Sequence, residues 1–181
     1  MRTSVIVTVT GGAVLLFWVI GANNRLVSLR NDISSAWGKV QDALSQRASG
    51  LAALAGLLRE PLAAEQGALD TWLAAHAEAA KAAAALGAKT VNEGAAQAWV
   101  AAESALSAAA SRLLALLEQQ PDLSQLEGFN DALTAWREGQ ARLPFARQLF
   151  NEAATAYNDA AGLFPTRIVA RGFRMGRAGL I

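Results

Sequence analysis

The chain has 181 residues, of which 53% are hydrophobic and 17% are charged, and its formal net charge is +1. This length suits one domain of ordinary size, and so apolar a composition excludes an intrinsically disordered protein. The near-zero net charge gives no overall attraction to nucleic acid. The chain has no cysteine and one histidine, which excludes disulfide scaffolds, thiol chemistry and metal sites built from cysteines or several imidazoles.

The first predicted element is a membrane anchor. Residues 3–22 carry no charge and lie between Arg2 and Arg25. At about 1.5 Å per residue, a helix of this length reaches roughly 30 Å, the thickness of the hydrocarbon layer of a bilayer. A cleaved signal peptide is the alternative interpretation, but its apolar region usually has only ~7–15 residues. We therefore expect residues 1–22 to form a single transmembrane helix.

The basic residues around this anchor indicate its orientation. Arg2 and the α-amino group precede it, whereas Arg25, Arg30 and Lys39 follow within about 20 residues, the range over which basic residues bias insertion. Positive charge favours the cytoplasmic side. The charge balance therefore favours a body on the cytoplasmic side of the membrane.

The sequence after the anchor predicts a continuation of the same helix. Apolar residues recur at close to heptad spacing, and no proline occurs before Pro61. These positions are Leu26, Leu29, Ile33, Ala36, Val40, Ala43, Leu51, Leu54, Leu57 and Leu58. We therefore expect one helix over residues 4–59 that ends at Glu60-Pro61, because proline lacks a backbone N–H.

The next two helices are predicted from their boundaries. An alanine-rich helix should extend from Pro61 to about Gly87. Thr90, with Glu93 three residues later, forms the capping-box pattern, which predicts a third helix over about 91–120.

Ser124 and Glu127 repeat the capping-box pattern and predict the start of a fourth helix. Its heptad seam comprises Phe129, Leu133, Trp136, Leu143, Phe150, Ala154, Tyr157, Ala161 and Phe164. Because this repeat keeps one face toward the partner helices, we expect Phe150, Tyr157 and Phe164 to occupy equivalent core positions.

Amphipathic helices joined by short links indicate an all-α fold. We expect an N-terminal transmembrane helix that continues into an antiparallel up-down four-helix bundle. The expected divisions are an anchor over 1–22, a helical bundle over 23–165 and a basic amphipathic tail over 166–181.

Two arginines on the seams and two asparagines beside the fourth seam need partners. Arg47 and Arg147 fall at seam positions, where an unpaired charge is costly. Counting ~1.5 Å per residue along the first and third helices places Arg47 and Glu118 at similar heights, so we predict an ion pair between them. Asn151 and Asn158 flank the fourth seam. They could offer amides to a ligand, but we expect them to bond to polar groups of an adjacent helix.

Three stretches resemble the LemA family of bacterial membrane-anchored helical proteins: "LVSLRNDISSAWGKVQDALSQR", "LLALLEQQPDLSQLEGF" and "RLPFARQLFNEAATAYNDAAGLFP". They occur in the family's order and spacing. We expect the matching residues Arg47, Glu118, Arg147, Asn151, Tyr157, Asn158, Phe164 and Pro165 to serve the structure. The resemblance implies a single-pass protein of the bacterial inner membrane, with its bulk in the cytoplasm, and implies no enzyme activity.

The tail, residues 166–181, contains arginines and apolar residues but no acid. An up-down bundle returns its last helix to the level where the first helix left the membrane. We therefore expect an interfacial segment whose arginines meet lipid phosphates, with a disordered basic terminus as the alternative. The predicted lipid-contacting residues are Arg167, Arg171, Phe173, Arg174 and Arg177.

No motif of catalysis or of cofactor binding occurs. The sequence has no glycine-rich phosphate loop and no His-Glu-x-x-His, and His76 stands without a partner motif. We expect no catalytic, cofactor-binding or metal-binding residues. The favoured function is a non-enzymatic scaffold or adaptor that contacts membrane lipid and an unidentified membrane or membrane-associated protein, with a homo-oligomer also possible. The alternative is a membrane-tethered module that binds nucleic acid or another anionic ligand through the arginines, although Phe173 alone offers poor base stacking.

Overall fold

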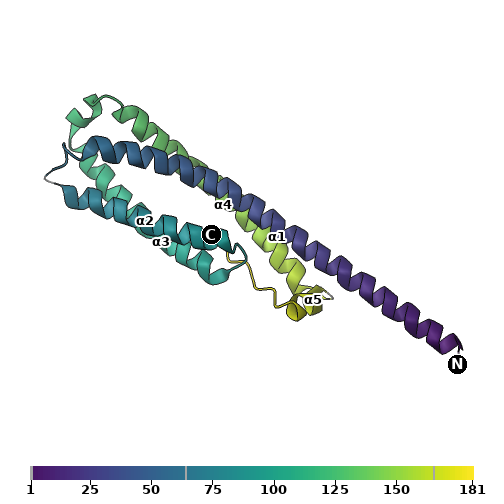
Figure 1. Cartoon of the computed structure of the whole chain (residues 1–181). Helices are drawn as coiled ribbons and strands as arrows, with labels where there is room; N and C mark the ends of the chain where they lie inside the picture. Colours follow the sequence, from purple (N-terminus) through teal and green to yellow (C-terminus); the bar gives the residue numbers. More distant parts are fainter. Residues whose placement is uncertain (1, 64, 165) are drawn as a thin grey trace.

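The computed structural model describes residues 2–63, 65–164 and 166–181, with side chains from residue 10 onward. Its first element, α1, extends from Arg2 to Leu58 without a break (Figure 1). The prediction of one continuous helix is thus confirmed. The first half of α1 projects beyond the other helices, and its described apolar side chains, including Leu16 and Phe17, are largely exposed.

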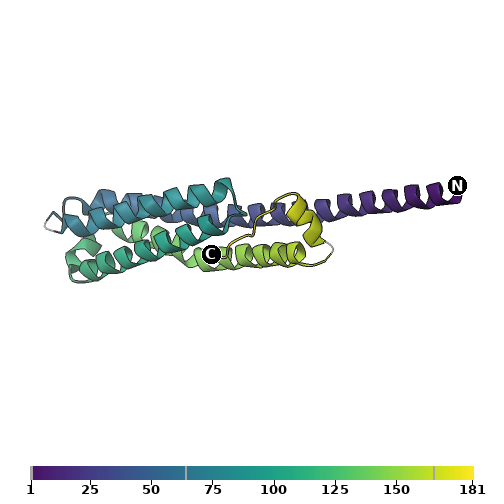
Figure 2. The ribbon, with the colours of Figure 1, turned by 90° about the horizontal axis from the view of Figure 1, so that it is seen from below.

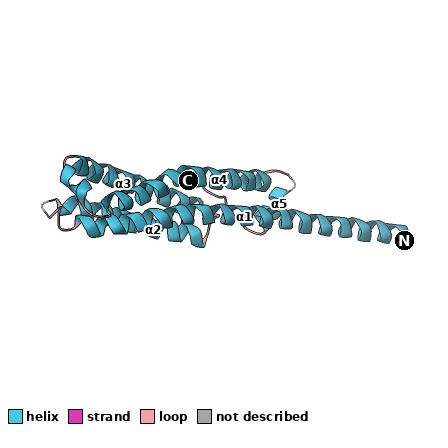
Figure 3. Ribbon diagram, turned by 90° about the horizontal axis from the view of Figure 1, so that it is seen from above, coloured by secondary structure: helices cyan, strands magenta, loops and turns pink. Residues whose placement is uncertain are grey.

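The remaining elements are α2 (Gln66–Ala88), α3 (Glu93–Glu118), the 3₁₀-helix η1 (Pro121–Gln125), α4 (Phe129–Gly162) and α5 (Thr166–Gly172). No strand occurs in the described residues, as Figure 3 also shows, and the predicted all-α fold is confirmed. The second helix begins later than expected, because residues 59–63 form a turn after α1.

Both predicted capping boxes are wrong. Asn92, not Thr90, caps α3: its Oδ1 accepts the backbone N–H of Ala95 at 3.0 Å. Asparagine is among the best capping residues, and Asn92 directly precedes the first residue of α3, whereas Thr90 is two residues further away. The Thr90 hydroxyl lies 3.3 Å from the hydroxyl of Ser34 on α1 instead.

At the start of α4, Ser124 is part of η1, the short helix that begins at Pro121, and its hydroxyl donates to the Pro121 carbonyl at 2.6 Å. The residue before α4 is Gly128, whose φ of +80° is tolerated because glycine has no Cβ. Proline at the start of η1 favours this short helix over the predicted cap.

The helices form two antiparallel pairs, α1 with α4 and α2 with α3 (Figures 1 and 2). The closest approach of α1 and α4 depends on two glycines. A Cβ atom on Gly139 would lie 2.5 Å from the backbone nitrogen of Arg47, and one on Gly50 would overlap the backbone of Trp136. A side chain at either position would therefore push the two backbones apart.

The apolar core consists of two clusters along the length of the molecule. The outer cluster joins all four long helices through residues such as Leu58, Trp72, Leu113 and Trp136. The inner cluster lies nearer the projecting part of α1. Its members include Leu26, Ile33, Trp37, Trp99, Phe150 and Tyr157, together with Val169, Ala170 and Ala178 from the C-terminal segment.

The C-terminal segment enters the core because the α2–α3 pair is short. The link between α2 and α3 reaches only the level of Ser34 and Trp37 on α1. Nearer the projecting part of α1, α1 and α4 continue without α2 and α3, and there α5 and the residues after it lie against them (Figure 2).

Most predicted seam residues are buried, but Phe164 is a clear exception. The α4 helix ends at Gly162, Leu163 is extended, and the side chain of Phe164 is 74% exposed. The prediction that Phe164 shares the core position of Phe150 and Tyr157 is wrong, because the heptad register has no meaning once the helix ends. Pro165 lies outside the described residues.

The glycine contact between α1 and α4 gives a testable prediction. Replacing Gly139 with Ala adds helix propensity but forces the backbones apart, and overpacking of this kind typically costs about 1–3 kcal/mol. We expect a lower unfolding temperature for the full chain in detergent, measured by circular dichroism. Gly38→Ala on α1 is the matched control, because no described atom outside the adjoining backbone of α1 and the two neighbouring residues lies within 4 Å of the place that its added methyl group would take. That variant should gain up to about 1 kcal/mol. Equal effects of the two substitutions would contradict the close contact.

Candidate functional site

The centre of the body contains a buried ion pair. Arg47 on α1 donates from Nη1 and Nη2 to the two carboxylate oxygens of Glu103 on α3, each at 2.7 Å. Arg47 is 3% exposed and Glu103 is 7% exposed. Gln140 on α4 accepts a further hydrogen bond from Arg47 Nη1 at 3.2 Å. This bidentate pair therefore joins three helices at one level, and removal of either partner would leave a buried charge.

The predicted pairing of Arg47 with Glu118 is wrong. That prediction placed the start of α3 level with the membrane end of the first helix. The α2–α3 link instead lies level with Ser34 and Trp37, so a residue in the first half of α3 reaches Arg47. Glu118 is exposed at the far end of α3.

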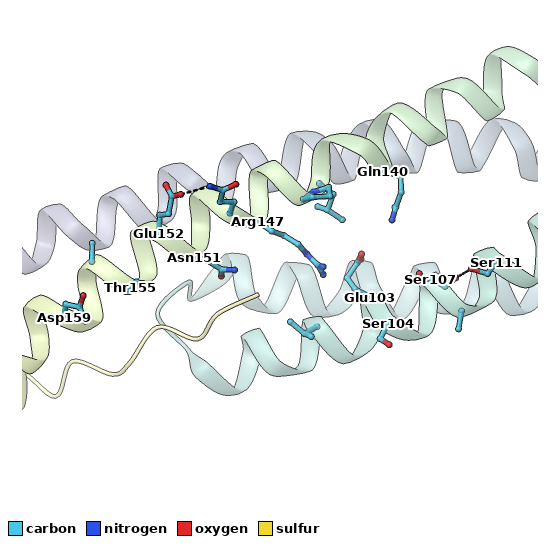
Figure 4. A pocket seen from close by; sticks show the side chains of 16 residues that line it. Glu103, Ser104, Ser107, Ser111, Gln140, Arg147, Asn151, Glu152, Thr155 and Asp159 are labelled. Atoms are coloured by element: carbon cyan, nitrogen blue, oxygen red, sulfur yellow. Dashed lines mark hydrogen bonds between the residues drawn. The ribbon is translucent and has the colours of Figure 1, made fainter.

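Arg147 on α4 has no carboxylate partner among the described residues. Its guanidinium carbon lies 4.6 Å from the centre of the Trp99 ring, a cation–π contact, and its Nε and Nη2 are buried there without a hydrogen-bond partner. Burial lowers the pKa of Arg147 from its ordinary value; Glu103 opposes this shift and Arg47 adds to it. Figure 4 shows Arg147 reaching from α4 toward Glu103 on α3.

His76 on α2 lies on the other side of the ion pair, beside a cavity of about 390 Å³ that Arg47 and Glu103 also line. Its Nδ1 is buried without a hydrogen-bond partner in the described part of the chain. Burial lowers the pKa of His76, the charge of Arg47 lowers it further, and Glu103 opposes the shift. Burial and the charge of Arg47 therefore both favour the neutral form of His76. The residues that the structure describes contain no group of three or more His, Cys, Asp or Glu side chains able to hold a metal ion.

The two asparagines of α4 hold the C-terminal segment. Asn158 donates from Nδ2 to the carbonyl of Ala178 at 2.8 Å and accepts the Ala178 N–H at 3.0 Å. Asn151 bonds to Ile181 in the same way, at 2.7 and 2.8 Å. The Tyr157 hydroxyl donates to the Gly176 carbonyl at 3.0 Å. The expectation that the asparagines bond to an adjacent helix is wrong, because their partner is the backbone of an extended segment.

This extended segment, residues 176–181, lies between α4 and α3. A Cβ atom on Gly179 would lie 2.5 Å from the Cβ of Ala96 and 2.9 Å from the Cα of Glu93, both on α3. Ala178 is buried in the inner core cluster. We call residues 176–181 the tail strand, meaning a single extended segment that belongs to no β-sheet in the described residues. Together with α5, it occupies the space that the short α2–α3 pair leaves open.

The five predicted lipid-contacting side chains, Arg167, Arg171, Phe173, Arg174 and Arg177, are all exposed. Three further apolar residues beside them, Leu163, Phe164 and Ile168, are also exposed. The buried face of α5, with Val169 and Ala170, packs against α1 and α4. These exposed residues belong to α5 and the chain on either side of it, and α5 lies at the end of the body from which α1 projects (Figure 1). We call this surface the collar.

The sequence analysis did not single out Glu103 or Trp99. A signal for Glu103 was present: it is the one acid in the interior of α3, between Glu93 and Glu118, on the same helix face as Trp99 and Leu106. An acid on a buried helix face requires a partner.

The ion pair gives a second prediction. Glu103→Gln leaves Arg47 charged and without a carboxylate in the core, a change that costs about 3–5 kcal/mol in comparable sites. We expect a corresponding fall in the free energy of unfolding, measured by denaturant titration of the full chain in detergent. Glu118→Gln, at an exposed position on the same helix, should change it by less than about 0.5 kcal/mol. A larger loss from Glu118→Gln than from Glu103→Gln would show that Arg47 does not pair with Glu103.

Comparison with known proteins identifies the family. The LemA family model matches residues 36–180, which include the ion pair, both asparagines and nearly all of the tail strand. A search of curated proteins gave no match. Since the family model covers most of the chain, the protein belongs to the LemA family.

Proposed function

We propose that this protein is a non-enzymatic scaffold or adaptor, a four-helix bundle carried on a single transmembrane helix. The observation that carries the proposal is the continuity of α1. Its exposed apolar half passes into the buried core positions that begin at Leu26, with no hinge between them. A body joined to its anchor by an unbroken helix holds its surfaces at a fixed height and orientation above the membrane, as an adaptor requires.

The proposal assigns the membrane crossing to α1 alone. Both α1 and α3 are long and apolar enough to cross a membrane. In the most apolar 18-residue stretch of α1, only 6% is buried inside the protein. In the corresponding stretch of α3, 33% is buried. The apolar side chains of α3, such as Trp99 and Leu113, already pack in the core. A single-pass topology therefore leaves the fewest apolar groups without a partner.

The collar supports attachment of the body to the membrane surface. Its apolar side chains, such as Phe164 and Phe173, are exposed where α1 emerges, and arginines surround them. Each arginine close to an anionic surface contributes about 1 kcal/mol. In this proposal the collar lies in the headgroup layer of the bacterial inner membrane, the body is cytoplasmic, and its partner is a membrane or membrane-associated protein or a second copy.

The alternative function, binding of nucleic acid or another anion, would use the same arginines. Phe173 is the one aromatic residue after Phe164, so the segment offers little base stacking. Both of its ends are also attached to the body, by the core contacts of α5 and by the asparagine bonds of the tail strand. These features favour a lipid surface over single-stranded nucleic acid as the partner of the arginines.

Photo-crosslinking tests the function and its alternative together. Phe17, Phe173 and Phe145 are exposed on the anchor, the collar and the outer surface of α4, and each is replaced in turn by benzoyl-phenylalanine in cells. We expect lipid adducts at Phe17 and Phe173, and a discrete protein adduct at Phe145. Phe150, which is fully buried, is the matched control and should yield no adduct with another molecule. Nuclease-sensitive adducts at Phe173 would favour the alternative. Absence of any protein adduct at Phe145 and at neighbouring exposed positions of α4 would contradict the adaptor function.

A further inference from the structure

The cavity of about 390 Å³ beside the ion pair lies between α1 and α2, and we call it the α1–α2 slot. Alanine side chains on α2 are too short to fill the space beside α1. The slot is elongated, because Trp37 and Arg47, which both border it, lie ten residues apart on α1 and so roughly 15 Å apart along the helix. Its apolar wall consists of Trp37, Leu44, Ala79, Ala80, Ala83 and Ala84.

One end of the slot is polar. Arg47 and His76 both border it, and Arg47 Nε and His76 Nδ1 are buried without a hydrogen-bond partner among the described residues. Arg47 as a whole is only 3% exposed. Buried polar groups in folded proteins almost always have a partner. Two unpaired nitrogens in the same wall therefore indicate a polar partner from outside the chain.

The guanidinium of Arg47 has an unused edge. Its Nη1 and Nη2 donate to Glu103 at 2.7 Å each, and Nη1 also donates to Gln140 at 3.2 Å. A guanidinium carries five N–H groups in a fixed planar fork, so the N–H of Nε and one N–H of Nη2 remain, side by side. Arg47 borders the α1–α2 slot and not the cavity between α3 and α4. The unused edge is therefore available to the slot.

The other end of the slot is closed by Trp37. Its ring packs edge-on against the ring of Trp99, with the ring centres 5.6 Å apart. A Cβ atom on Gly87 would lie 2.6 Å from Trp37 Nε1, so the indole lies directly against α2. The slot opens to solvent along its side. The exposed residues at this opening are Gln41, Ala80 and Ala84.

The charges around the slot select a neutral ligand with an acceptor atom. Arg47 Nε can only donate, so the ligand must present an oxygen or a similar acceptor. Glu103 also borders the slot and already neutralises Arg47, whereas Arg147 does not border it. Burial and the charge of Arg47 favour the neutral form of His76. A second carboxylate would therefore be buried without a compensating charge, which is costly. A carbonyl oxygen avoids this cost.

We propose that the α1–α2 slot binds a small, neutral, elongated molecule that has an apolar body and a carbonyl group at one end. The carbonyl oxygen accepts hydrogen bonds from Nε and Nη2 of Arg47, beside His76. The apolar body lies along the alanines of α2 toward Trp37. Ligand sites of this kind combine mainly apolar walls with a few polar groups that fix the orientation of the ligand. This site is independent of the proposed adaptor function.

The test is an NMR titration of the full chain, without a histidine tag, in detergent micelles. The probe is para-ethylbenzamide, which is neutral and elongated and has one carbonyl. The chain has one histidine, so all imidazole signals belong to His76. We expect these signals to change saturably, with half-saturation at roughly 1 mM for a ligand of this size. The Arg47 Nε–H signal should move downfield as it gains a hydrogen bond. Para-ethylbenzoate has the same shape but a negative charge, and it should bind about tenfold or more weakly.

Variants of α2 locate the probe. Ala83 is buried in the wall, and Ala83→Leu places a larger side chain in the slot, so it should weaken binding by about tenfold or more. Ala85→Leu is the matched control, because Ala85 is exposed on the same helix outside the wall, and it should bind like the unaltered chain. Circular dichroism checks the fold of each variant. Ala80→Leu, at the opening, repeats the test if Ala83→Leu disturbs the fold.

Absence of a saturable change at His76 would overturn the inference. So would equal binding of the amide to the unaltered chain and to the folded wall variant, because the probe would then lie elsewhere. Tighter binding of the benzoate, or saturation at His76 without a shift of the Arg47 Nε–H signal, would contradict the assigned chemistry. None of these results bears on the adaptor function, which the crosslinks at Phe145 decide.

Discussion

The mismatch in length between the two helix pairs is the constraint on which the rest of the structure depends. The α1–α4 pair extends toward the projecting part of α1 well past the link between α2 and α3. Core residues such as Leu26 and Tyr157 would face water there without a further cover. Burying a side chain of this size contributes about 1.5–3 kcal/mol, so leaving them exposed would be costly. The C-terminal segment supplies the cover, with α5 at the end of the body and the tail strand against α3 and α4.

Two kinds of polar contact hold these parts in register. The Arg47–Glu103 pair fixes the height of the α2–α3 pair on α1, and the absence of side chains at Gly50 and Gly139 brings α4 close to the same level. The asparagines of α4 then fix the tail strand through its backbone. Non-directional apolar packing would tolerate sliding along the helices, whereas bidentate bonds tolerate little. The ion pair therefore helps to specify the arrangement, and loss of either partner would leave an unpaired charge in the core.

The features that were predicted correctly from the sequence are those that helical periodicity encodes. The continuity of α1, the buried positions from Leu26 to Leu58 and the buried positions from Phe129 to Tyr157 follow from heptad spacing, and the family followed from the quoted stretches. Periodicity says which face of a helix is buried but not how far one helix is shifted along another. The partner of Arg47 was misplaced for that reason.

The remaining errors concern the C-terminal half of the site. Phe164 continued the heptad pattern past the end of the helix, where the pattern no longer describes the backbone. The tail strand has no periodicity, and its bonds to Asn151 and Asn158 involve its backbone, which every sequence possesses. Only the repeat of the two asparagines, together with Gly179, hinted at an extended partner. Because the bonds involve the backbone of the tail strand, only the asparagines that bind it can be recognised in the sequence.

The most direct test of this account is amide hydrogen exchange at Ala178 and Ile181, measured by NMR on the full chain in detergent micelles. Both amides donate to asparagine side chains, so the account predicts that both are protected from exchange. Asn158→Ala should remove protection at Ala178 first, and Asn151→Ala at Ile181. Exchange of both amides in the unaltered chain at the rate of an unstructured peptide would contradict the account, because the inner core would then have to be covered in some other way.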